Sequence, residues 1–86
     1  MASAGEVKAA IAQATEQANK GMNQLGQGAQ LLSQAQAMLV AVAQGSSHEA
    51  LGQASQALHQ AQQEIGTAQA AVHNATQQAR QYAQGL

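Results

Sequence analysis

Three histidines are the residues of this 86-residue chain best suited to acid–base or metal chemistry. His59 and His73 fall on one outer stripe of an expected helix, but they are fourteen residues apart, roughly 21 Å along a helix axis. His48, His59 and His73 each lack an Asp, Glu or second His three or four residues further along, which is the spacing of a helical metal site. We therefore expect no metal site, and we assign no role to His59 or His73.

Other arrangements that perform catalysis are also missing from the sequence. The acidic residues are scattered rather than paired, and they are Glu6, Glu16, Glu49 and Glu64. Ser46 and Ser47 have no base beside them and suit a helix cap, while the glycines are spread along the chain rather than gathered in a phosphate loop. The sequence therefore predicts a protein that is not an enzyme and has no cofactor.

Composition excludes further classes of protein. Three basic and four acidic residues give a net charge of −1, which leaves no basic patch for nucleic acid or anionic lipid. The longest apolar run, residues 37–43, is far shorter than the roughly 20 residues that span a bilayer, and residues 1–10 lack the pattern of a secretory signal peptide. We expect a cytoplasmic protein without a nucleic-acid or membrane partner, and secretion without a cleaved signal peptide stays open.

The chain contains 22 alanines and 18 glutamines and no proline, a composition that favours helix. Apolar residues recur every three or four positions on both sides of Gly45, which predicts helices over about 4–44 and 47–84 with a turn at 45–46. Ser3 with Glu6, and Ser46 with Glu49, have the spacing of a capping box, and Gly45 suits a left-handed helix end. Residues 1–86 are thus expected to form one all-α antiparallel two-helix hairpin.

The same spacing predicts a coiled-coil seam rich in alanine and glycine. Pairing residues whose numbers sum to 93 sets one large residue against one small one from Leu39 to Val72. The seam residues expected to hold the shape are Leu25, Gly28, Leu32, Leu39, Leu58, Ile65 and Val72. The remaining members of the series are Val7, Ile11, Ala14, Ala18, Gly21, Ala35, Val42, Leu51, Ala54, Ala61, Ala68, Ala75, Ala79, Tyr82 and Leu86.

Five glycines lie inside the expected helices, where each costs about 1 kcal/mol relative to alanine. Gly21 and Gly28 are expected to face Val72 and Ile65, where a methyl group would clash. Three others fall on the outer face, either as tolerated variation or as a second close contact with a partner helix, and they are Gly26, Gly52 and Gly66.

Apolar residues left outside the seam predict a partner surface. Leu31 and Met38 flank the seam on one side of the first helix, and Ala50 and Ala57 occupy the corresponding flank of the second. The opposite flank of the first helix carries Met22, Ala29 and Ala43. The patch of Leu31, Met38, Ala50 and Ala57 has two interpretations: extra core in a homodimeric four-helix bundle, or a docking surface for a different, sister helical protein.

A chain of this length, with two antiparallel helices and a glycine at the mid-chain turn, resembles the small WXG-type substrates of type VII secretion. It resembles still more closely an uncharacterised actinobacterial family of Ala- and Gln-rich helical hairpins. Gly45 corresponds to the glycine of the Trp-x-Gly turn, although the tryptophan is absent, and Tyr82 corresponds to the tyrosine of the C-terminal export signal, with Leu86 where that signal has an acid. The resemblance implies a hairpin that pairs with itself or with a sister protein.

Together these features predict a non-enzymatic protein–protein interaction or scaffold module. The alternative function is a secreted substrate of a type VII-like export system, or the partner of one.

Overall fold

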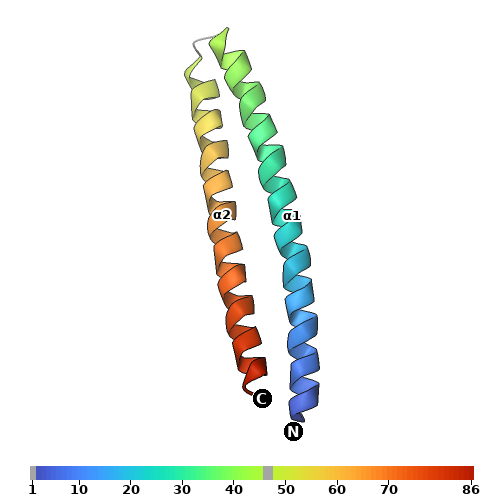
Figure 1. Cartoon of the computed structure of the whole chain (residues 1–86). Helices are drawn as coiled ribbons and strands as arrows, with labels where there is room; N and C mark the ends of the chain where they lie inside the picture. Colours follow the sequence, from blue (N-terminus) through green and yellow to red (C-terminus); the bar gives the residue numbers. More distant parts are fainter. Residues whose placement is uncertain (1, 46–47) are drawn as a thin grey trace.

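The computed structural model describes residues 2–45 and 48–86, and over these residues it consists of two long helices (Figure 1). Helix α1 spans Ala4–Gln44, the range expected from the sequence, and α2 spans Glu49–Gln84. They run antiparallel, so that both chain ends lie at the same end of a particle measuring 63 × 17 × 15 Å. The predicted all-α helical hairpin is confirmed.

Helix α1 is capped at both ends by local hydrogen bonds. The Ser3 hydroxyl accepts a hydrogen bond from the Glu6 backbone N–H at 3.1 Å, as an N-cap serine does. Gly45 ends the helix, but its φ of −92° is not left-handed, so the predicted conformation is wrong. The Gly45 N–H instead bonds to the Val42 carbonyl oxygen at 3.1 Å, a tightened last turn that requires no positive φ.

Helix α2 begins at Glu49, two residues later than the sequence predicts. Its N-cap is His48, whose Nδ1 accepts a hydrogen bond from the Ala50 backbone N–H at 3.3 Å. The predicted cap at Ser46, with Ser47 beside it, lies outside the described residues. An imidazole nitrogen therefore takes the place of the expected hydroxyl oxygen at the start of α2.

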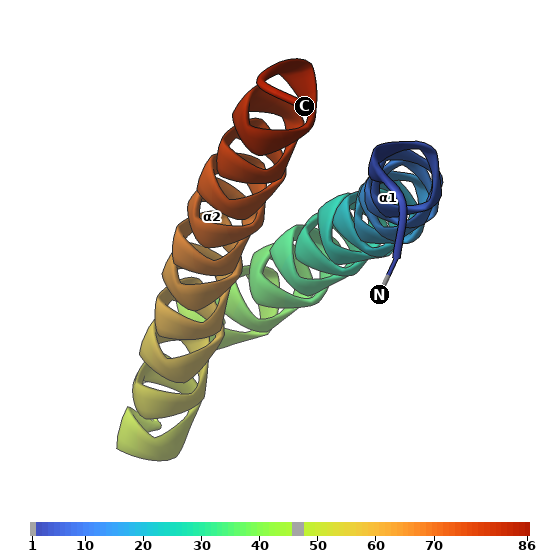
Figure 2. The ribbon, with the colours of Figure 1, turned by 90° about the horizontal axis from the view of Figure 1, so that it is seen from below.

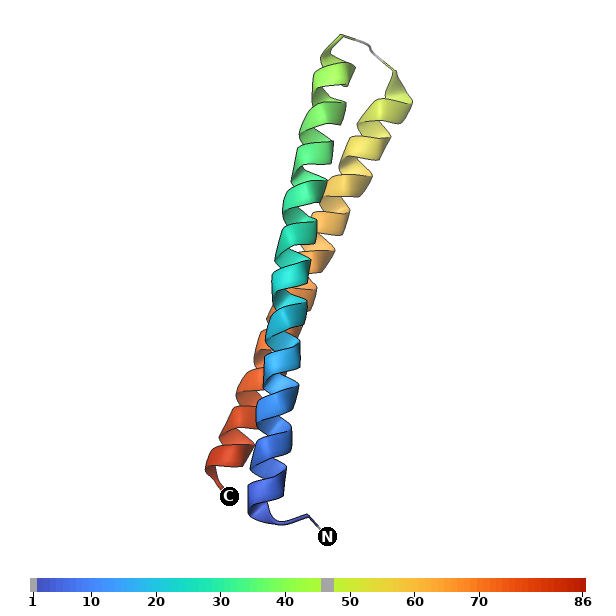
Figure 3. The ribbon, with the colours of Figure 1, turned by 90° about the vertical axis from the view of Figure 1, so that its right-hand side faces the viewer.

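The two helices cross at a small angle rather than running exactly side by side (Figures 2 and 3). Between them lies one series of half-buried or buried residues at alternating spacings of three and four, which we call the inner seam. On α1 the inner seam comprises Ile11, Thr15, Ala18, Met22, Leu25, Ala29, Leu32, Gln36, Leu39 and Ala43. On α2 it comprises Leu51, Ser55, Leu58, Gln62, Ile65, Gln69, Val72, Thr76, Ala79 and Ala83.

The inner seam is rotated relative to the predicted one. All seven residues expected to hold the shape are half-buried, but several smaller or terminal members of the predicted series are exposed: Ala14, Val42, Ala54, Ala75, Tyr82 and Leu86. Their places are taken by the residues that follow them, and Met22, Ala29 and Ala43, predicted to lie on a flank, are half-buried in the inner seam. In the middle of the hairpin both sets share the contact, since Gly21, Ala35, Ala61 and Ala68 of the predicted series are half-buried as well.

This rotation removes the predicted reason for two glycines. A methyl group built on Gly21 or Gly28 would meet no side chain within 4 Å, so neither residue avoids a clash with Val72 or Ile65. Gly26, predicted on the outer face, is half-buried, and a methyl group there would lie 3.6 Å from Gln69 Nε2. A methyl group at Gly52 or Gly66 would meet nothing.

Candidate protein-interaction surface

Two grooves between the helices identify the two broad faces of the hairpin. One groove is apolar and is lined by Ala14, Thr15, Ala18, Val72, Ala75, Thr76 and Ala79. The other lies near the chain ends and includes charged and polar residues, among them Lys8, Glu16, Asn19 and Arg80. We call the face whose groove holds no charged residue the apolar face, and the face whose groove holds Lys8, Glu16 and Arg80 the polar face.

The apolar face continues from this groove toward the turn. In a coiled coil, residues seven apart on one helix point in the same direction, so Ala35 lies on the side of Ala14, and Ala54 on the side of Ala75. Around these two positions is a surface that we call the turn-proximal apolar face. It comprises Gly28, Leu31, Ala35, Met38 and Val42 of α1 and Ala50, Ala54, Ala57 and Ala61 of α2.

Large apolar side chains on this face are open to solvent. Leu31 is 64% exposed, Met38 70% and Val42 57%. Ala50 and Ala57 are exposed as well. By the seven-residue spacing, the four residues predicted as a partner surface lie on the same face of the hairpin. Val42 belongs to the same surface, and the sequence-based prediction missed it because it assigned Val42 to the seam.

The polar face carries the residues first considered for chemistry. One stripe of α2 on this face has a residue every seven positions: Gly52, His59, Gly66, His73 and Arg80. Each histidine pairs with the glutamine four residues later, His59 with Gln63 at 3.3 Å and His73 with Gln77 at 3.1 Å. Across residues 2–45 and 48–86, no group of three His, Asp or Glu side chains is placed to hold a metal ion.

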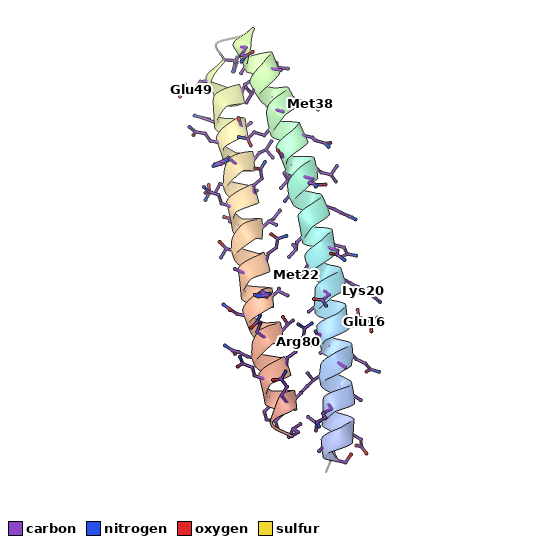
Figure 4. The ribbon with its side chains drawn as sticks, in the orientation of Figure 1. Glu16, Lys20, Met22, Met38, Glu49 and Arg80 are labelled. Carbon is purple, nitrogen blue, oxygen red and sulfur yellow. The ribbon has the colours of Figure 1, made fainter. Side chains whose placement is uncertain are left out.

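Charged side chains are sparse, and the two nearest the turn-proximal apolar face are Glu49, which adjoins Ala50, and Glu64. Glu16 and Lys20 form an ion pair at 4.0 Å, both well exposed, and lie on the outer side of α1 (Figure 4). Arg80 projects between the helices in the same view, where it lines the groove that also holds Lys8. The nearest acid along the alanine stripe of α2 is Glu64, which bounds the face on the side away from the turn.

The hairpin has almost no core of its own. Among the described residues no apolar side chain is buried, and the single buried residue is Thr15 at 8% exposure. The accessible surface is 6234 Å². A compact protein of the same mass, 8.7 kDa, exposes about 4,700 Å².

Neither helix, within the described residues, has a stretch apolar and long enough to cross a membrane. Comparison of the chain with protein-family models, curated proteins and solved structures finds no match.

Proposed function

We propose that this protein is a non-enzymatic helical interaction module that pairs with a second copy of itself through the turn-proximal apolar face. The observation that carries the proposal is the combination of an absent core with a face of exposed Leu31, Met38 and Val42. A two-helix hairpin must bury apolar surface to offset the chain entropy lost on folding, and this one buries little. A second copy, packed on this face, supplies the additional buried apolar surface.

The areas support a second copy as the partner. The chain exposes ~1,500 Å² more than a compact protein of its mass. A stable interface buries about 800 Å² on each partner. Full burial of one Leu, Met or Val side chain contributes about 1.5–3 kcal/mol, and each copy offers three of them.

Leu31→Glu combined with Met38→Glu tests this proposal. Two carboxylates in the centre of the interface cannot be buried without partners, so the double variant should be a monomer when its mass is measured by light scattering. Val40→Glu is the matched control. Val40 is 42% exposed, and it lies three seven-residue steps after Asn19, so it is on the polar face and outside the proposed interface. The Val40→Glu variant should keep the wild-type mass of about twice 8.7 kDa. A double variant that keeps the wild-type mass would overturn the proposal.

The resemblance to secreted hairpins supports the second candidate, export without a cleaved signal peptide. Tyr82 is 61% exposed in the last turn of α2, where a transport machinery has access to it. The test is the amount of the chain in washed culture medium from intact cells, for the wild type and for Tyr82→Ala. Export that depends on Tyr82 supports this candidate, and retention of the wild type inside the cells contradicts it.

A further inference from the structure

The two halves of the turn-proximal apolar face differ in size. The α1 half carries the large side chains Leu31, Met38 and Val42, whereas the α2 half consists of alanines at positions 50, 54, 57 and 61. Large residues stand on only one helix, so the way in which two copies meet decides what each helix packs against. The arrangement of the two copies rests on the proposed self-pairing and specifies its geometry.

Two hairpins can stack face to face about a twofold axis in two ways. If the axis runs along the helices, α1 of each copy lies on α2 of the other, and both turns are at the same end. If the axis runs across the helices within the interface plane, α1 lies on α1 and α2 on α2, with the turns at opposite ends.

The first arrangement matches large residues with small ones. Leu31 is thirteen residues before the end of α1 at Gln44, and residue 62 is thirteen residues after the start of α2 at Glu49. Leu31 therefore stands level with Ala61 and next to Glu64, which bounds the face. By the same count Met38 is level with the alanines at 54 and 57. The large side chains of each α1 therefore lie over the alanines of the partner's α2. The two contacts between the copies are equivalent, so they have the same interaxial distance.

The second arrangement makes two unlike helix contacts. Gln17 and Gln24 of the same α1 stripe would be covered at full overlap in either arrangement, so the comparison depends on the large side chains near the turn. With partial overlap, large side chains of the two α1 helices would meet one another, while alanines of the two α2 helices would meet. The α1–α1 contact would then need a larger interaxial distance than the α2–α2 contact.

We infer that the dimer is the first of these arrangements: α1 of each copy packs on the alanine stripe of the partner's α2, and the two turns lie at the same end. The chain has no cysteine, so a single nitroxide label at Gln44→Cys reports on the turn. Two such labels should be separated by about 20–35 Å, given interaxial distances of 8–10 Å and the label tethers. Turns at opposite ends would place the labels roughly 60 Å apart, close to the length of the particle, 63 Å.

A mixed dimer provides the control for this distance measurement. When chains labelled at Gln44→Cys are mixed with chains labelled at the exposed Gln84→Cys, the mixed dimer should add a long distance to the short distances of the two homodimers. Long distances between two Gln44→Cys labels, in a particle of dimeric mass, would overturn the arrangement while leaving the proposed self-pairing intact. A monomeric mass without any dipolar signal would overturn both.

A size exchange across the interface tests the contact itself. Ala57→Met adds bulk to the alanine stripe, and Ala57 is exposed in the hairpin, so the change should spare the fold but weaken dimerisation by roughly tenfold or more. Adding Met38→Ala on the facing helix should recover at least part of that loss. If Met38→Ala instead weakens the Ala57→Met dimer further, the two residues do not face one another and the arrangement is wrong.

Discussion

Gln62 donates a side-chain hydrogen bond to Gln36 across the inner seam, with 3.1 Å between Nε2 and Oε1. Both residues are half-buried, and among the described residues this is the one hydrogen bond that joins α1 to α2. The large apolar residues of the seam tolerate sliding, because leucines 25, 32 and 39 of α1 repeat every seven residues. The glutamine pair therefore fixes the alignment of the two helices.

A double-mutant cycle measures the contribution of this hydrogen bond. Gln36→Ala and Gln62→Ala should each lower the free energy of unfolding, and the double variant should lose less than the sum of the two. The coupling energy should be about 0.5–1.5 kcal/mol, as for a hydrogen bond between neutral groups, and urea unfolding provides it. Strictly additive losses would mean that the pair does not form in solution.

Gly66→Ala should stabilise the protein. A methyl group at this position meets no side chain within 4 Å, and Gly66 lies on the polar face away from the proposed interface. The gain in the free energy of unfolding should be about 1 kcal/mol, the difference in helix propensity. Gly52→Ala should behave in the same way, and a loss of stability in either variant would show a close contact at that position.

Gly45→Ala should change stability by less than about 0.5 kcal/mol. Gly45 ends α1 with φ at −92°, a conformation open to alanine, and the added methyl group would lie at an ordinary 3.8 Å from the Val42 carbonyl oxygen. Thermal unfolding at equal protein concentrations makes the comparison. A loss of about 1 kcal/mol or more would instead indicate a left-handed helix end, as the sequence alone suggested.

His48→Asp should stabilise the first turn of α2. The His48 ring already accepts a hydrogen bond from the Ala50 N–H, and an aspartate is a stronger N-cap whose charge also suits the helix dipole. The expected gain is about 0.5–1 kcal/mol, seen as slower amide exchange in the first turn. His59→Asp, inside the helix, is the control and should give no gain. Equal effects of the two substitutions would show that His48 does not cap α2.

The sequence was sufficient for the hairpin because several local signals agree. Unbroken apolar spacing, the Ser3 cap and the glycine at position 45 all place the helix ends within two residues of those observed. The large members of the seam, such as Leu32 and Ile65, were also identified correctly, because a large apolar residue every seven positions leaves little choice of face.

The rotation of the seam could not be read from the same pattern. Each helix has apolar or small residues on both sides of its large ones, for example Ala35 and Gln36 after Leu32, so periodicity alone allows two centres for the contact. The structure centres the contact on the Gln36 side, where the amide bonds to Gln62, and Ala35 beside it is also half-buried. This choice leaves Ala35 and Val42 on the turn-proximal apolar face, beside the Leu31 and Met38 that the sequence had already placed outside the seam.

Sedimentation equilibrium of the wild-type chain, over a wide range of concentrations, is the most direct test of the proposed self-pairing. We predict a dimer of about twice 8.7 kDa that persists to low micromolar concentration, because each copy buries three large apolar side chains on the other. A fully helical monomer of 8.7 kDa at every concentration would contradict the proposed pairing.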